Sequence, residues 1–130
     1  IMLLEWKSGD VMGNKNNFFS GITELLILAI INDHDSYAYE IVKRIKEYSD
    51  NYLSISQNTI YAVIYKLENE GKISHYSKLV GKRRTRVYYH IEEVGKVYYQ
   101  EVLNNFRNAY NGVENILSAL DATEEEKENE

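Results

Sequence analysis

The sequence contains no cysteine and no proline, and it has no long apolar run. Without cysteine the chain can form no disulfide framework, no thiolate zinc site and no cysteine nucleophile. Its longest apolar run, Leu25–Ile31, is far shorter than the ~20 residues needed to span a bilayer. With 130 residues, 44% of them hydrophobic, the chain suits one compact domain plus an extra helix. These features predict a soluble, cytoplasmic, globular protein with no membrane partner.

Acidic and basic residues are unevenly distributed along the chain. The last ten residues, 121–130, carry six acids and one lysine, which accounts for the whole net charge of −5. We expect this acidic tail to be disordered, because it has little apolar surface to bury. Between Gly71 and Ile91 there are six basic residues and no acid, and such a local field selects partners of opposite charge.

The chain begins with Ile1 rather than methionine, and residues 1–11 show no clear period. We expect Met12 to be the natural start and residues 1–11 to be a remnant or upstream read-through, within an N-terminal extension of residues 1–17 that precedes the functional domain.

Apolar residues recur at helical spacing in three segments, at 18–32, 37–50 and 56–70. Ser36 or Asp35 is expected to cap the second helix, and Ser56 the third. Gly71 stands where a left-handed residue would end the third helix. The residues expected to face inward on the second helix are Ala38, Ile41, Val42, Ile45 and Tyr48, and those on the third are Ile60, Val63, Ile64 and Leu67.

After Gly71 the period changes to about two residues, and 72–79 and 86–91 are rich in β-forming residues. Gly81-Lys82-Arg83-Arg84 lies between them, so the segment predicts a β-hairpin with a basic tip. Three helices followed by a hairpin describe a winged helix-turn-helix over residues 18–91, which is mainly α with a small β-hairpin.

A final helix is expected over residues 92–120. Its apolar residues step alternately by three and four positions, as in a coiled coil. At ~28 residues the helix would be about 40 Å long, more than so small a domain can cover. We therefore expect a homodimer whose interface includes Tyr99, Val102, Phe106, Val113, Ile116 and Leu120.

The third helix occupies the place of a recognition helix, which enters the DNA major groove. Asparagine and glutamine match adenine, and a helix N-terminus favours phosphate. The alternative is an ordinary capped helix with a polar face; exposed tyrosines favour contact with a partner. The candidate DNA-binding residues of this helix are Ser56, Gln57, Asn58, Thr59, Tyr61, Tyr65 and Lys66.

The basic hairpin tip has no acidic neighbours in sequence, whereas a merely solubilising loop usually mixes charges of both signs. Its cations suit phosphate or minor-groove contact, where charge dominates affinity. The candidate DNA-binding residues of the tip are Lys82, Arg83, Arg84 and Arg86.

From Leu25 to Gly95 the chain resembles the PadR family of bacterial transcriptional regulators. The family's run similar to GYEI-KRL appears at Ala38–Ile45, its run similar to TLYPAL-RLE-EGLI at Thr59–Ile73, and its basic wing leading to YY-LT--G at Arg83–Gly95. The sequence departs from these patterns at three positions, with Ala38 in place of glycine, Ala62 in place of proline and Glu92 in place of threonine. None is expected to break the fold, although Ala62 could alter docking on DNA.

The resemblance implies a homodimer in which the C-terminal helix packs against the partner's N-terminal helix. It also implies repression at a dyad-symmetric operator in double-stranded DNA, with release by a small aromatic or phenolic effector in several relatives. No motif here identifies effector residues.

The three histidines, His34, His75 and His90, are too few and too scattered for a metal site, although the last two could face each other across the hairpin. No catalytic triad spacing or phosphate-binding glycine loop is present, so we expect no enzyme, no metal and no cofactor.

The sequence therefore predicts a DNA-binding transcriptional regulator, and the family resemblance, rather than any residue, implies a repressor. One alternative is a winged-helix protein-interaction module without DNA binding, which the acidic pI of 5.3 favours. Another is a regulator whose wing binds DNA only when a ligand is present.

Overall fold

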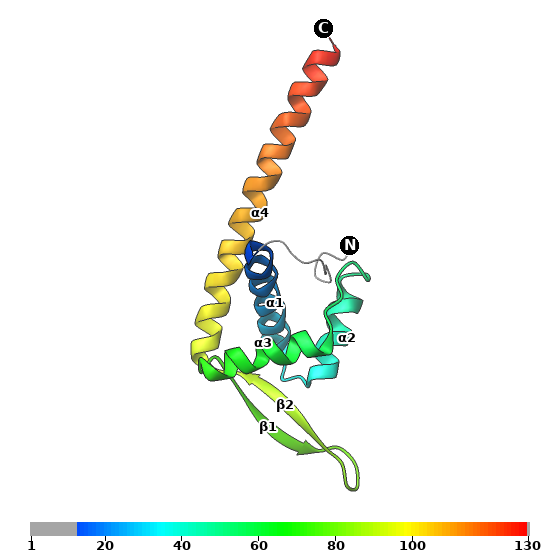
Figure 1. The fold of residues 1–130 in the computed structure, drawn as a ribbon, viewed down its shortest axis with the longest axis vertical. Coiled ribbons are helices and arrows are strands. Elements are labelled where there is room, and N and C mark those ends of the chain that lie inside the picture. The colour runs from blue at the N-terminus through cyan, green and yellow to red at the C-terminus, as the bar shows by residue number, and fades with distance from the viewer. Residues whose placement is uncertain (1–12, 130) are drawn as a thin grey trace. The chain divides into compact units, whose positions relative to one another are not determined.

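A computed structural model of the chain describes the backbone of residues 13–129 and the side chains of residues 21–129. The expectations for residues 1–11 and Met12 lie outside these residues. The elements, shown in Figure 1, are α1 (Gly13–Asp33), α2 (Ala38–Tyr48), α3 (Gln57–Asn69), β1 (Ile73–Leu79), β2 (Thr85–Ile91) and α4 (Glu93–Glu128). The chain divides into two units, residues 1–99 and 100–130, so that α4 begins in the first unit and forms the second. This order of elements confirms the predicted winged helix-turn-helix with a long C-terminal helix.

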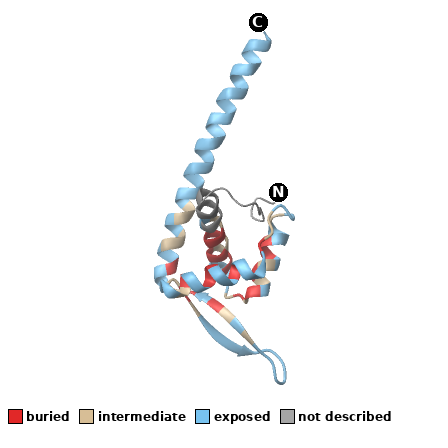
Figure 2. Ribbon diagram, viewed as in Figure 1, coloured by how far each residue is buried: buried red, intermediate tan, exposed pale blue. Residues whose placement is uncertain are grey.

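The core of the first unit lies among α1, α2, α3 and the inner face of β2. Figure 2 shows the buried residues concentrated on the facing sides of these elements. The centre of α1 contributes Ile27, Leu28 and Ile31, each no more than 1% exposed. Residues three and four apart lie on one helix face, and burying that face supplies most of the stability of such a helix.

Helix α3 agrees with its sequence pattern in detail. Ser56 is the N-cap, and its hydroxyl accepts a hydrogen bond from the amide of Thr59 at 3.2 Å. Gly71 has a φ of +73°, the left-handed conformation expected after the helix end. All four residues predicted to face inward are buried, namely Ile60, Val63, Ile64 and Leu67.

The start and end of α2 differ from the expectation. Tyr37 is the N-cap and no side chain caps the helix, so neither Ser36 nor Asp35 has the predicted role. Ser36 instead forms a backbone bridge with Tyr89 of β2, through amide-to-carbonyl hydrogen bonds of 3.3 and 2.8 Å. Tyr48, expected in the core, is 71% exposed, whereas Arg44 of the same helix is buried. The burial of Arg44 was not predicted, because it depends on hydrogen bonds to its guanidinium that the local sequence pattern does not show.

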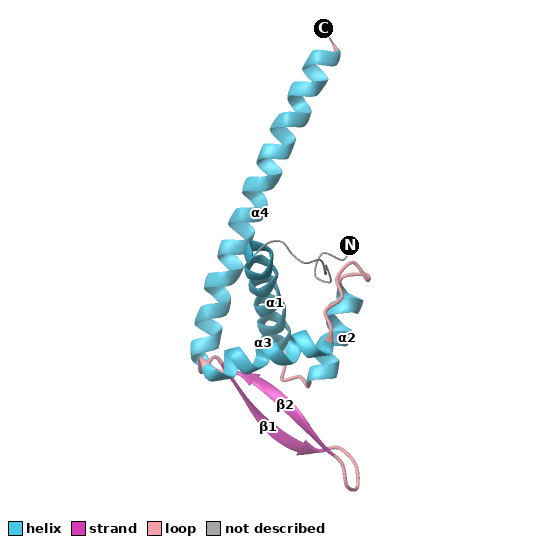
Figure 3. Ribbon diagram, viewed as in Figure 1, coloured by secondary structure: helices cyan, strands magenta, loops and turns pink. Residues whose placement is uncertain are grey.

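Strands β1 and β2 form an antiparallel hairpin, drawn as magenta arrows in Figure 3, and with the connecting residues 80–84 they make the wing. In its register His75 pairs with Tyr89, and Ser74 pairs with His90. His75 and His90 therefore do not face each other, since neighbouring positions along a strand point to opposite sides of the sheet.

Helix α4 starts one residue later than predicted and ends later, because it continues through the acidic residues 121–128. The expectation of a disordered tail differs from the structure over these residues. Alanine, glutamate and lysine are good helix formers, so an existing helix can extend through them without burying any surface. Among the helices of the described part of the chain, none has an apolar stretch long enough to cross a membrane.

Helix α4 contains two glycines that we expect to respond oppositely to substitution. A Cβ at buried Gly95 would overlap the carbonyl oxygen of Lys72, whereas a Cβ at Gly112 would meet nothing within 4 Å. Gly95→Ala should lower the free energy of unfolding by about 2 kcal/mol through overpacking. Gly112→Ala should raise it by about 0.5–1 kcal/mol, because alanine loses less backbone entropy in a helix.

Urea unfolding at matched protein concentrations measures both variants, with Gly112→Ala as the control for Gly95→Ala. A Gly95→Ala protein as stable as the parent would contradict the close approach of α4 to the start of β1.

Candidate nucleic-acid interface

The exposed face of α3 is made almost entirely of neutral polar and aromatic groups. Tyr61 and Tyr65 are 46% and 69% exposed. They lie one helical turn apart, so their rings share one face. The predicted contact residues at the start of this face are also exposed, namely Ser56, Gln57, Asn58 and Thr59.

Lys66 is the one cation of α3, and the structure gives it a partner within the chain. Its ammonium contacts the carboxylate of Glu24, which is 3% exposed and comes from α1. Tyr98 of α4 donates a second hydrogen bond to Glu24, at 2.6 Å. Hydrogen bonding to Glu24 raises the pKa of Lys66, although burial opposes the effect. Local sequence patterns do not indicate this ion pair, because its two members are 42 positions apart.

Unlike Lys66, the cations of the wing tip have no partner within the described part of the chain. Lys82, Arg83 and Arg84 are exposed, and their side chains make no hydrogen bond or ion pair with the rest of the described chain. A backbone hydrogen bond of 2.9 Å from Val80 to Arg84 closes the loop and presents the tip as a compact turn. Three unpaired positive charges on one short loop are suited to bind a polyanion.

Arg86, the fourth predicted wing cation, lies on β2 and is half-buried. Its guanidinium lies 4.0 Å from the ring centroid of Tyr37, which is close enough for a cation–π interaction. The ring of Tyr37 meets that of Tyr88 edge to face at 5.5 Å, and Tyr88 stacks on Tyr76 at 5.8 Å. We call Tyr37, Tyr76 and Tyr88 the wing aromatic cluster. Sequence reasoning missed it, although the alternation in both strands places Tyr76 and Tyr88 on one face.

The turn between α1 and α2, residues 33–37, attaches the wing to the helical core. Asp35 accepts hydrogen bonds from the hydroxyl of Tyr76 at 2.7 Å and from Nδ1 of His90 at 2.9 Å. Burial raises the pKa of Asp35, but these two hydrogen bonds outweigh it and hold the pKa below its usual value. With the Ser36 bridge, these contacts fix the direction in which the wing leaves the core.

Four charged groups gather at the other side of the same turn. His34 lies 3.0 Å from both Asp33 and Glu40, one carboxylate at each ring nitrogen. Arg44 donates to Asp33 at 3.0 Å and to the hydroxyl of Tyr48 at 3.0 Å. Hydrogen bonds to Glu40 and then Asp33 raise the pKa of His34 above its usual 6.5.

The described residues hold no cluster of three or more histidine or acidic side chains that could bind a metal ion.

The predicted dimer residues lie on α4. Tyr99 packs partly against the core of its own unit. Val102 is half-buried. The other four are exposed by 42–62%, namely Phe106, Val113, Ile116 and Leu120.

Comparison with known proteins gives a family and a set of similar structures. Residues 27–101 match the family described as transcriptional regulator PadR-like. The structure of smu.1704 from Streptococcus mutans UA159 is 31% identical, with a TM-score of 0.68, over 76% of this chain and 89% of that one. A transcriptional regulator from Clostridium thermocellum is 27% identical, with a TM-score of 0.66, over 80% of this chain and 95% of that one. Bacillus subtilis PadR, solved in complex with operator DNA, is 23% identical, with a TM-score of 0.58, over 63% of this chain and 47% of that one.

The charge cluster around His34 predicts a pH-dependent contribution to stability. Because the pKa of His34 is raised on folding, its ion pairs stabilise the fold below about pH 6.5 and are lost as the pH rises through the folded value. His34→Gln should lower the free energy of unfolding at about pH 5.5 and change it little at about pH 8.5. Half of the His34 side chain is exposed, so the difference should shrink in high salt.

An NMR titration tests the same cluster directly. Glu40→Gln should lower the pKa of the His34 imidazole, whereas Glu47→Gln, which removes an exposed carboxylate from the same helix, should not. Equal His34 titration curves in the two variants would show that Glu40 does not control it.

Proposed function

The chain belongs to the PadR-like family of transcriptional regulators, and from this premise we propose that it binds operator DNA as a homodimer and represses transcription. The observation that carries the proposal is the contrast between two adjoining surfaces. The wing tip presents three unpaired cations, and the exposed face of α3 presents neutral hydrogen-bonding and aromatic groups.

The wing supplies the electrostatic part of binding in this proposal. Each phosphate neutralised by Lys82, Arg83 or Arg84 releases a counterion, which gives an affinity that falls steeply with salt but carries little sequence information. Arg86, stacked on Tyr37, is held in place and would contact the backbone with little loss of side-chain freedom.

Helix α3 supplies base recognition. Gln57 and Asn58 can each donate to and accept from the major-groove edge of adenine, the pairing that their amide groups fit best. Reading guanine normally requires an arginine or lysine, and the single lysine of α3 is held by Glu24. Tyr61, Tyr65 and the methyl group of Thr59 would meet thymine methyl groups. We therefore expect half-sites rich in A·T pairs.

Dimerisation would proceed through the apolar stripe of α4, where Phe106, Val113, Ile116 and Leu120 are exposed along one face. A stripe of this kind is covered in a stable protein, and its steps of three and four residues match a helix partner. Two copies related by a two-fold axis would place their α3 helices about one DNA turn apart, ~10 bp, on a dyad-symmetric operator. A small aromatic effector that prefers another spacing of the two helices would release the operator.

Removal of the wing-tip charge tests the DNA contact. Arg83→Ala with Arg84→Ala should weaken binding to all sequences and reduce the slope of log affinity against log salt by about one unit for each phosphate that the wing no longer neutralises. The matched control is Arg107→Ala with Lys127→Ala on α4, which removes the same charge and should leave the slope unchanged.

Fluorescence anisotropy with DNA from upstream of the protein's own gene, with unrelated DNA as competitor, measures these effects. An unchanged slope in the wing variant would contradict the placement of the wing on DNA. No binding by the parent protein at low salt, with or without effectors, would favour a protein-interaction module instead.

The dimer is tested by charge on the α4 stripe. Phe106→Asp with Val113→Asp should yield a monomer in sedimentation, because each carboxylate would lie unpaired in an apolar interface. Asn104→Asp with Asn111→Asp adds the same charge on the opposite side of the helix and should leave a dimer. A dimer in both variants would show that the copies associate elsewhere.

A further inference from the structure

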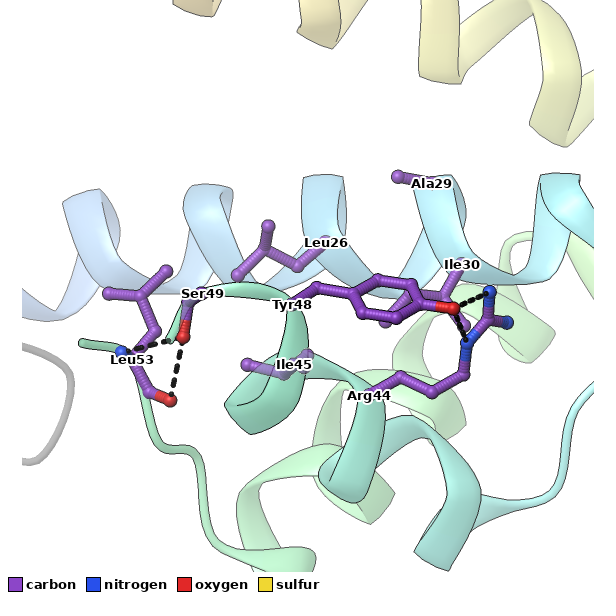
Figure 4. Close-up of a pocket in the computed structure, with 8 residues that line it drawn as sticks. All are labelled: Leu26, Ala29, Ile30, Arg44, Ile45, Tyr48, Ser49 and Leu53. Atoms are coloured by element: carbon purple, nitrogen blue, oxygen red, sulfur yellow. Dashed lines mark hydrogen bonds between the residues drawn. The ribbon is translucent and has the colours of Figure 1, made fainter. Parts of the chain in front are cut away.

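We propose that a pocket between α1 and α2 is an effector site for a neutral, single-ring compound that carries one hydrogen-bond acceptor such as a carbonyl. The inference rests on the proposed function and names the site and ligand class of its effector. The pocket lies in the first unit, has a volume of about 230 Å³, and is shown in Figure 4.

The walls of the pocket are almost wholly apolar. Leu26, Ala29 and Ile30 come from α1, Ile45 comes from α2, and Leu53 closes one end. Ser49 also lines it, but its hydroxyl is engaged with the amide of Leu53 at 2.9 Å and with backbone carbonyls. The wall that a ligand would meet on these sides is therefore hydrocarbon.

The other end of the pocket carries a polar group that is prepared to donate. The hydroxyl of Tyr48 accepts two hydrogen bonds from the guanidinium of Arg44, at 3.3 and 3.0 Å. Within the described residues nothing accepts the proton of this hydroxyl. In Figure 4 the oxygen of Tyr48 lies at the guanidinium of Arg44, and the residue is 71% exposed, so a ligand can reach it. A hydroxyl that accepts from a cation is a stronger donor, so this end favours an acceptor on the ligand.

The volume and the charges limit the class of ligand. A cavity of ~150 Å³ lined by aliphatic side chains holds benzene, so about 230 Å³ suits one ring with a short substituent. An anion is disfavoured, because Arg44, the one charged residue that lines the pocket, is already paired with Asp33. A ligand carboxylate would lose its hydration without gaining a free cation.

The pocket is joined to the wing through the turn at residues 33–37. Arg44, at the polar end of the pocket, is bonded to Asp33, the first residue of this turn. Two residues later, Asp35 holds Tyr76 and His90 of the wing, and Ser36 is bridged to Tyr89. A ligand that accepts a hydrogen bond from the Tyr48 hydroxyl would alter the hydrogen bonds of Arg44. Through Asp33 it would then affect the turn that orients the wing.

The experiment uses the full chain, labelled with ¹⁵N, and three probes of similar shape: acetophenone, ethylbenzene and benzoate. Acetophenone should bind saturably and shift the amides of Ile45 and Tyr48. Ethylbenzene, which lacks the carbonyl, should bind about fivefold more weakly, the effect of one neutral hydrogen bond. Benzoate should bind about tenfold more weakly than acetophenone or worse.

Two variants locate the ligand. Tyr48→Phe should lower the affinity for acetophenone to that for ethylbenzene, and Tyr39→Phe, an exposed tyrosine of the same helix outside the pocket, should change neither. Ala29→Phe fills the pocket and should abolish binding of both probes. Unsaturable shifts, equal binding to Ala29→Phe, or benzoate as the tightest probe would each overturn the assignment. The assignment would also be overturned if no probe bound because the second copy of the dimer covers the pocket.

The effector role is measured separately on DNA. Saturating acetophenone should change the dissociation constant for operator DNA by about fivefold or more in the parent protein and leave that of Ala29→Phe unchanged. Binding in the pocket without an effect on DNA affinity would overturn the effector role. If the protein binds no DNA under any condition, the proposed function fails, while the NMR titration still decides whether the pocket binds the probe.

Discussion

The orientation of the wing depends on a backbone pairing between segments that are far apart in sequence. Ser36 exchanges two hydrogen bonds with Tyr89, so a single β-bridge ties the short turn between α1 and α2 to β2. Isolated two-stranded hairpins are at best marginally stable in water, and here the bridge and the packing of Tyr89 and Ile91 in the core attach the hairpin to the helices. Asp35 and Tyr37 on either side of Ser36 then hold the outer face of the wing. This attachment fixes the direction in which the basic tip projects from the core.

A second contact joins three helices through one carboxylate. Glu24 of α1 is buried and bonded to Lys66 of α3 and to Tyr98 of α4. A buried charge is tolerated only when it is paired and hydrogen-bonded. The carboxylate of Glu24 therefore holds both α3 and the start of α4 in position. This contact also pairs the positive charge of Lys66 within the chain, although half of the Lys66 side chain is exposed on the face that α3 offers to a partner. The electrostatic and the neutral parts of the candidate interface are therefore separate in space.

The elements of the fold could be predicted from local spacing, and the contacts between them could not. The buried face of α3, the Ser56 cap and Gly71 follow from periodicity and from the conformations that serine and glycine favour. Ser36 was misjudged because a serine before a helix has the same pattern whether its hydroxyl caps the helix or its backbone pairs with a strand. The Glu24–Lys66 pair and the stacking of Arg86 on Tyr37 depend on tertiary packing, which periodicity does not report. The helical state of residues 121–128 reflects propensity, which outweighed the lack of burial.

Under the proposed function, the separation of the wing-tip cations from the exposed residues of α3 has an evolutionary consequence. When one helix carries both phosphate-binding cations and base-reading side chains, a change of target sequence also changes general affinity for DNA. On this proposal the exposed residues of α3 can be exchanged while the wing keeps the three cations of its tip and the bridge from Tyr89 to Ser36. Copies of such a gene that diverge after duplication can acquire new promoters through a few substitutions in α3. Each copy would retain DNA affinity throughout, so no intermediate on that path need be inactive.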